Sequence, residues 1–162
     1  MKIRTNRNPV AQETFRALGG IEPHVCEVED LKAEMAAGNC EAGESVFSRI
    51  YPLQQNEVTE SVIDSQHSLF LTTMIIGDAF WKQLSPEVQA VIKDAAIKAG
   101  RKERQATIDD GEAAKARLIA EGVNIHKITP EEKSEWKQKT QVVYEKFEPT
   151  FTPGLIEQIK NA

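Results

Sequence analysis

The sequence is poor in the residues from which disulfide scaffolds and metal sites are built, because it has 2 cysteines and 3 histidines among 162 residues. Two cysteines provide neither a disulfide framework nor a four-ligand zinc site. His24, His67 and His126 stand apart, and no H-x-x-x-H or C-x-x-C spacing occurs. We therefore expect no metal and no cofactor.

Long apolar runs and an excess of positive charge are also missing. The longest apolar candidate, residues 69–76, includes Thr72 and Thr73 and is much shorter than the ~20 residues of a membrane-spanning helix. The chain has 20 basic and 25 acidic residues, and its net charge of −5 does not suit a nucleic-acid partner. The first residues lack the apolar segment of a secretory signal. We expect no membrane insertion, no nucleic-acid partner and no signal peptide in these residues.

The first half of the chain alternates short apolar strands with helices. Each connection between successive strands is a dozen or more residues long and contains a helix, which favours a parallel sheet, so the predicted fold class is α/β. Asn8 before Pro9 is a helix cap, and Gly19-Gly20 is a stop signal. We expect strands at residues 2–5, 24–26, 40–43, 59–64 and 69–76, and helices at residues 9–18, 30–37 and 46–53.

Residues 77–162 are predicted to be almost entirely helical. Ser85-Pro86-Glu87 has the features of a helix start, with a hydroxyl cap, a proline and then an acid. Apolar residues continue at helical spacing toward the stop signal Gly122, which predicts one long helix over residues 85–121, in which Gly100 or Gly111 would permit a bend. At ~1.5 Å per residue this helix is too long for one small domain to cover.

A strand over residues 123–128 and a capping box, Thr129-Pro130-Glu131-Glu132, follow the long helix. A last helix is expected after Pro153-Gly154. The pattern divides the chain into an α/β segment, residues 1–84, and a helical segment, residues 85–162.

Several stretches, in order and spacing, resemble a known family. They are Met1-Lys2-Ile3-Arg4 with Asn8-Pro9-Val10, Phe80-Trp81-x-x-Leu84-Ser85-Pro86-Glu87-x-Gln89-x-Val91-Ile92, and Glu121-Gly122-Val123 followed by Thr129-Pro130-Glu131-Glu132. The chain resembles the extracytoplasmic solute receptors of TRAP transporters (tripartite ATP-independent periplasmic transporters), of the dicarboxylate-receptor type. Family members are about twice as long, and the resemblance places Met1 at the first strand of their second lobe. We interpret the chain as the C-terminal half of such a receptor.

The resemblance implies a fold and a binding site. The fold is the second lobe of a periplasmic-binding-protein-like protein, with a small, mostly parallel sheet, a long bridging helix and C-terminal helices that return toward the first lobe. The substrate-carboxylate arginine of the family falls at Arg4, whose planar fork suits a carboxylate. Ser45 replaces a ligand-contacting asparagine, and His67 lies near a histidine of the strand crossover. Glu44 and Asn6 lie beside these positions, Glu44 as a solvated or hinge-side charge and Asn6 within reach of the ligand through water.

The function implied by the resemblance is transport without catalysis. The receptor would capture a small organic carboxylate in the periplasm and deliver it to the TRAP membrane permease, and an isolated half would bind weakly or not at all. The sheet order of the family separates Cys26 from Cys40 by one strand, so we expect two free thiols. Two alternatives stay open: a cytosolic single-domain α/β enzyme or regulatory domain that uses Glu44 or His67, and a helical interaction protein built on residues 85–121.

Overall fold

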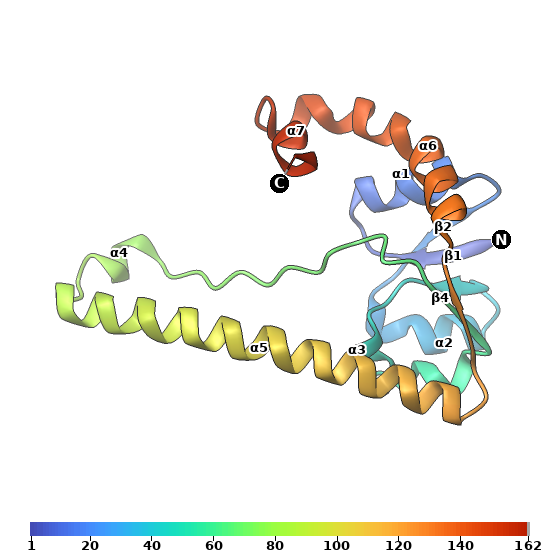
Figure 1. The fold of residues 1–162 in the computed structure, drawn as a ribbon, viewed down its shortest axis with the longest axis horizontal. Helices are drawn as coiled ribbons and strands as arrows, with labels where there is room; N and C mark the ends of the chain where they lie inside the picture. Colours follow the sequence, from blue (N-terminus) through green and yellow to red (C-terminus); the bar gives the residue numbers. More distant parts are fainter. Residues whose placement is uncertain (162) are drawn as a thin grey trace.

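The computed structural model describes residues 1–161. Short strands and helices alternate up to residue 64, and long helices dominate the rest of the chain (Figure 1). In chain order the elements are β1 (Lys2–Thr5), α1 (Pro9–Leu18), β2 (Glu22–Val25), η1 (Val28–Asp30), α2 (Leu31–Ala36), β3 (Ala42–Gly43), α3 (Phe47–Ile50), η2 (Gln55–Val58), β4 (Ser61–Asp64), α4 (Asp78–Trp81), α5 (Pro86–Ala120), β5 (Asn124–Lys127), α6 (Pro130–Phe147), η3 (Glu148–Thr150) and α7 (Leu155–Lys160).

The strands form two small parallel sheets, which confirms the α/β class, although the sequence suggested a single sheet. The first sheet has the order β2-β1-β3, with Arg4 level with His24 on one side and Gly43 on the other. The second sheet pairs β4 with β5, from Ser61 opposite Asn124 onward. Helical connections between strands of the first sheet carry the chain back to the same edge, so its strands run parallel. The carboxyl ends of β1, β2 and β3 therefore meet at one edge.

Local signals in the sequence define where the main helices begin. The Asn8 side chain accepts a hydrogen bond from the Val10 N–H at 2.8 Å, and Ser85 caps α5 in the same way. Thr129 and Glu132 form the expected capping box. The 35-residue helix α5 runs through both of its internal glycines without interruption, as the apolar spacing predicted.

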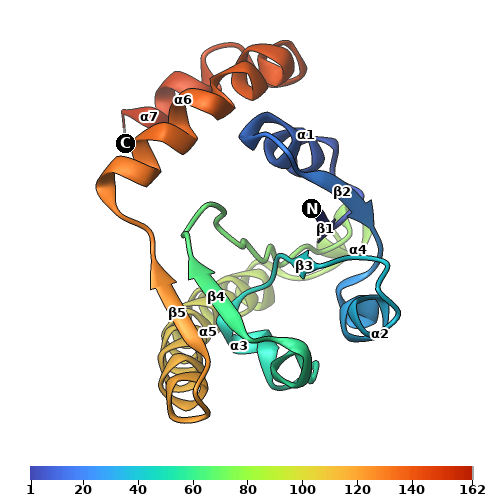
Figure 2. The same ribbon diagram turned by 90° about the vertical axis from the view of Figure 1, so that its right-hand side faces the viewer.

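The packed body of the molecule lies at one end of α5. There α3 packs on the carboxyl-terminal part of α5, where Leu118 is fully buried. Helix α6 packs on α1, with Phe15 and Val143 buried (Figure 2). This contact places α6 on the same body as the first sheet. The return of the C-terminal helices toward a first lobe stays a prediction. The division of the chain after residue 84 stays a prediction.

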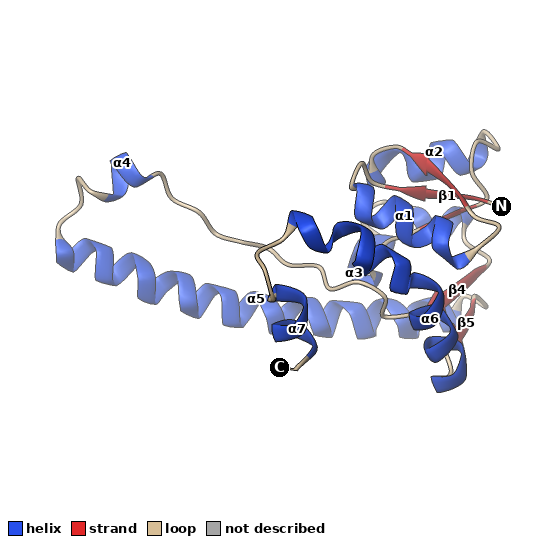
Figure 3. Ribbon diagram, turned by 90° about the horizontal axis from the view of Figure 1, so that it is seen from above, coloured by secondary structure: helices blue, strands red, loops and turns tan. Residues whose placement is uncertain are grey.

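An arm projects from this body. It consists of the extended residues 65–77, the short helix α4 and the amino-terminal part of α5 (Figures 1 and 3). The predicted strand at residues 69–76 is wrong for this chain, because the segment has no regular secondary structure. A strand needs a neighbour for its backbone hydrogen bonds, and none lies beside this segment within residues 1–161. No helix in the described part of the chain is long and apolar enough to cross a membrane.

Candidate functional site

Arg4 lies near the carboxyl end of β1, the central strand of its sheet, and only 4% of the residue is exposed. Its Nε donates a hydrogen bond to the carbonyl oxygen of Cys26 at 2.9 Å, just after β2. A terminal nitrogen donates to the carbonyl oxygen of Glu44 at 3.4 Å, just after β3. Main-chain oxygens from both neighbouring strands therefore hold the guanidinium at the edge where the three strands end.

The positive charge of Arg4 has no carboxylate partner among residues 1–161. The more exposed arginines Arg7, Arg16, Arg49 and Arg117 each pair with a glutamate instead. A guanidinium carries more N–H donors than two carbonyl oxygens can use. Because a buried charge without a counter-ion is unfavourable, and because the planar fork matches a carboxylate, the position is suited to an organic anion.

Glu44 is held close to Arg4 but faces other partners. The Thr5 hydroxyl donates to Glu44 Oε1 at 2.7 Å, and His67 Nε2 lies 3.3 Å from Oε2. His67 is oriented in turn by Ser65, whose Oγ lies 2.7 Å from Nδ1. Glu44 is hydrogen-bonded to Arg4 only through its main chain: its carbonyl oxygen accepts from the guanidinium, and its N–H donates to the Arg4 carbonyl oxygen at 3.2 Å. Its carboxylate bonds to Thr5 and His67 instead. This arrangement keeps the fork of Arg4 available to another acceptor.

The hydrogen bonds also fix the charge of Glu44. Burial alone would raise the pKa of this carboxyl group, but hydrogen bonds from His67 and Thr5 outweigh burial, and the pKa lies below its usual value. The carboxylate is thus ionised at neutral pH. Both ring nitrogens of His67 have partners, since Nε2 faces Glu44 and Nδ1 faces the Ser65 hydroxyl.

Ser45 and Asn6 lie at the same edge without touching Arg4 through their side chains. Ser45 is exposed and directly follows Glu44, whose carbonyl oxygen accepts from Arg4. Asn6 Oδ1 accepts a hydrogen bond from the Asn8 N–H at 3.0 Å and so serves the turn into α1. The structure therefore gathers Arg4, Glu44 and His67 into one cluster, with Ser45 next to it, while the amide oxygen of Asn6 is used locally.

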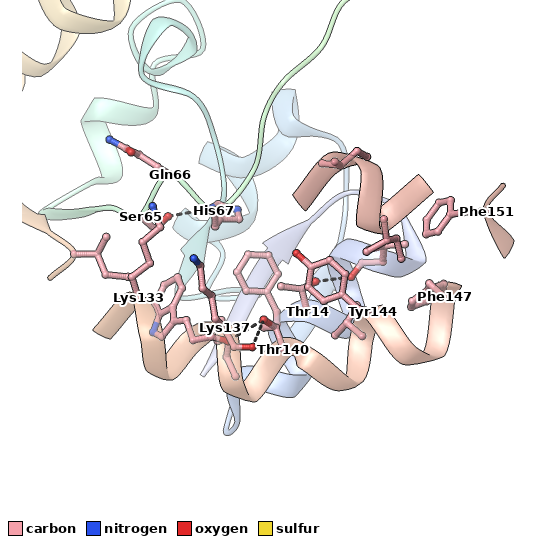
Figure 4. A pocket seen from close by; sticks show the side chains of 18 of the residues that line it. Thr14, Ser65, Gln66, His67, Lys133, Lys137, Thr140, Tyr144, Phe147 and Phe151 are labelled. Carbon is pink, nitrogen blue, oxygen red and sulfur yellow. Dashed lines mark hydrogen bonds between the residues drawn. The ribbon is translucent and has the colours of Figure 1, made fainter. Parts of the chain in front are cut away.

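A separate cavity of about 470 Å³ lies between α1, α6, α7 and the turn at residues 65–67 (Figure 4). Its lining is mostly apolar and includes Tyr144 and Phe147, and its lysines, Lys133 and Lys137, are exposed. Arg4 and Glu44 do not line this cavity, although His67 does. We place the candidate site at Arg4, because it is the one charged residue that is buried among residues 1–161.

The sequence reasoning missed two polar residues of the cluster, Thr5 and Ser65. Thr5 is fully buried beside Arg4, and Ser65 directly follows β4, two residues before His67. Both lie where a strand ends, which is where ligands bind in open α/β sheets. A search for hydroxyl groups at the last residue of each predicted strand or directly after it would have found them.

Comparison with known proteins places the chain in a family. The profile of the bacterial extracellular solute-binding proteins, family 7, matches residues 1–150. The chain therefore belongs to this family of solute-binding proteins, and the resemblance to TRAP receptors is confirmed.

Two curated relatives match nearly the whole chain. The ectoine-binding periplasmic protein TeaA of Halomonas elongata is 27% identical over 98% of this chain and 48% of its own length. The C4-dicarboxylate-binding protein DctB of Bacillus subtilis is 22% identical over 97% of this chain and 45% of its own length. The chain thus spans about half the length of the curated relatives that it matches.

Solved structures show the same fold. A TRAP periplasmic solute-binding protein from Pseudomonas putida F1, with bound D-glucuronate, has a TM-score of 0.83 at 20% identity, covering 100% of this chain and 51% of the other. One from Shewanella oneidensis, with bound succinate, has a TM-score of 0.82 at 22% identity, covering 97% of this chain and 52% of the other. The α/β arrangement and the long helix are therefore those of this class of proteins.

Proposed function

We propose that this chain supplies part of the ligand site of a TRAP-type solute-binding protein, in which Arg4 binds the carboxylate of a small organic acid. The protein would act in the periplasm and deliver its solute to a TRAP membrane permease, by binding alone and without catalysis. The single observation that supports this proposal is the buried, unpaired charge of Arg4 at the carboxyl ends of three parallel strands. The bound solutes of two structural relatives, D-glucuronate and succinate, are carboxylates.

The neighbours of Arg4 account for how the site would work. The carbonyl oxygens of Cys26 and Glu44 fix the plane of the guanidinium, so little side-chain entropy is lost when a carboxylate binds. Thr5 and His67 hold the Glu44 carboxylate, which would otherwise compete for the same fork. The hydroxyl of Ser45 can add one hydrogen bond to the solute at the rim. Closure of a second lobe over this edge would then exclude water and strengthen the charge-assisted bonds.

The test is an NMR titration of the 162-residue chain with sodium D-glucuronate and with succinate. The Arg4 Nε–H signal and the amide signals of residues 44, 45 and 67 are expected to shift together and saturably, with affinity in the millimolar range because only part of the site is present. Arg4→Ala should abolish these shifts. Arg4→Lys should restore only part of the binding, because an ammonium group cannot form the two parallel bonds of the fork.

The matched control is Arg7→Ala, since Arg7 lies three residues away and is exposed, and its charge is already paired with Glu27 at 3.6 Å. This variant should bind like the parent chain. Shifts that survive in Arg4→Ala, or that cluster around Lys133 and Lys137 at the apolar cavity, would refute the assignment. In a protein with both lobes, loss of Arg4 should cost about 2–5 kcal/mol of binding free energy.

A further inference from the structure

The cavity between α1, α6, α7 and the turn at residues 65–67 is not used by the candidate site at Arg4 (Figure 4). Its volume of about 470 Å³ lies within the range of about 300–1,000 Å³ that is typical of pockets for small molecules. Side chains of three helices and of the turn line it, so it is a pocket and not a flat surface patch. Its size suits a small organic molecule.

One end of the cavity is aromatic, and the side chains of the protein do not fill it. Tyr144, Phe147 and Phe151 lie together at this end (Figure 4). Tyr144 is 47% exposed and Phe151 is 41% exposed, although both line the cavity. Ile159 of α7, across the same space, is 67% exposed. Apolar surface that stays in contact with water favours the binding of an apolar group here.

The opposite end of the cavity is positively charged. Lys133 and Lys137 lie one turn apart on α6 and extend toward the turn at residues 65–67 (Figure 4). Neither ammonium group pairs with a carboxylate of residues 1–161, whereas Lys139 and Lys146 of the same helix each pair with a glutamate. Two like charges at this spacing repel each other. Because no acidic side chain in the described part of the chain lines the cavity, this end is complementary to an anion.

The middle of the cavity offers few hydrogen-bond donors. The Thr14 hydroxyl donates to the carbonyl oxygen of Val10 at 2.9 Å, and the Thr140 hydroxyl donates to that of Trp136 at 2.8 Å. Both hydroxyl hydrogens are therefore used within their own helices. A polyhydroxylated solute such as a sugar acid would lose its water here without gaining equivalent bonds, which is unfavourable. The middle suits an alkyl or aryl group instead.

We propose that this cavity is a second binding site, for an amphipathic monocarboxylic acid. The carboxylate lies between Lys133 and Lys137, and the apolar body extends between α1, α6 and α7 toward Phe147. A carboxylic acid with one aromatic ring or a medium-length alkyl chain has this shape. Water screens the exposed lysines, so burial of apolar surface supplies most of the affinity and the charges set the orientation. The site is independent of Arg4, and either proposal can fail alone.

The experiment is an NMR titration of the 162-residue chain with sodium 4-phenylbutyrate and with sodium octanoate. The indole N–H of Trp136 and the amides of Thr140 and Tyr144 report on the cavity, because all three residues line it. These signals should shift saturably with a Kd of about 1 mM, as the usual binding energy per atom of a small ligand predicts. An excess of sodium D-glucuronate should leave the Kd unchanged.

Two comparisons test where the carboxylate lies. Lys133→Gln/Lys137→Gln should weaken binding of both acids by about two- to thirtyfold, the range expected for two exposed ion pairs. The uncharged analogue 4-phenylbutan-1-ol should bind this double variant and the parent chain equally. The matched control Lys127→Gln/Lys139→Gln removes two exposed lysines that do not line the cavity, and it should bind the acids like the parent chain.

Four results would overturn the proposal. The first is the absence of saturable shifts at Trp136, Thr140 and Tyr144 with both acids. The second is displacement of the acids by D-glucuronate, which would place them at the Arg4 site. The third is equal binding of the acids by the parent chain and by Lys133→Gln/Lys137→Gln. The fourth is a dimer in light scattering that excludes the acids from the cavity, which would make a second copy of the chain its occupant.

Discussion

A methyl group added at Gly43 should destabilise the protein, because β3 packs against the buried side chain of Leu31. A Cβ at Gly43 would lie 2.5 and 2.7 Å from the two Leu31 methyl carbons and 3.2 Å from Leu31 Cγ. Carbon atoms in contact are normally about 3.5–4.0 Å apart, so an overlap of about 1 Å must be relieved. Only 4% of Leu31 is exposed, and it cannot swing into solvent without uncovering the α2 side of the sheet.

The size of the effect follows from two opposing terms. Overpacking of this kind costs about 1–3 kcal/mol. Gly43 has no left-handed backbone angle, so alanine can adopt its backbone conformation. Alanine also lowers the conformational entropy of the unfolded chain, which stabilises the folded protein by about 0.4–1 kcal/mol. We expect Gly43→Ala to lower the free energy of unfolding by about 0.6–2 kcal/mol, the difference of these two terms. Because Glu44 follows directly, the same change should also disturb its bond to Thr5.

Urea unfolding followed by circular dichroism measures this free energy. Gly111→Ala is the matched control, because a Cβ there meets only Phe47 Cβ at an ordinary 3.9 Å within α5. It should stabilise the chain by about 0.5–1 kcal/mol, the helix cost of glycine. The double variant Gly43→Ala/Leu31→Ala should lose less stability than the sum of its single variants, since the new methyl fills part of the cavity. Equal or higher stability of Gly43→Ala would refute the packing argument.

Three further predictions concern the core, the Glu44 carboxylate and the thiols. Leu118→Ala should lower the free energy of unfolding, measured in urea, by about 2–5 kcal/mol, because Leu118 is fully buried. Ile119→Ala should lower it by well under half of that, because Ile119 is 62% exposed. Similar losses in both variants would show that α5 is not buried as described. Because folding lowers the pKa of Glu44, its ionised form stabilises the protein above the usual value of 4.5, and this contribution is lost as the pH falls through the lower folded value. Glu44→Gln should therefore flatten the acid limb of the stability–pH curve, and an unchanged limb would contradict the hydrogen bonds. Burial raises the pKa of both thiols, but Cys40 is only 3% exposed, so N-ethylmaleimide should label Cys26 first and Cys40 only on unfolding, as mass spectrometry can follow.

The sequence by itself determined the elements whose signals are local. A cap such as Asn8, Ser85 or Thr129 bonds to a backbone N–H two or three residues away, and proline in the first turn needs no partner elsewhere. The three helices therefore begin where the residues predicted. The order β2-β1-β3 was expected from the family resemblance, and the helical connections are compatible with its parallel strands.

Only the tertiary structure decided which distant groups meet. The sequence did not show that Cys26 and Glu44 would hold the Arg4 guanidinium, or that Thr5 and His67 would draw the Glu44 carboxylate toward themselves, because these contacts join residues 22 to 40 positions apart. Residues 69–76 have the composition of a strand, yet a strand exists only where a neighbour completes its hydrogen bonds. Composition is a property of the segment, whereas pairing depends on what lies beside it.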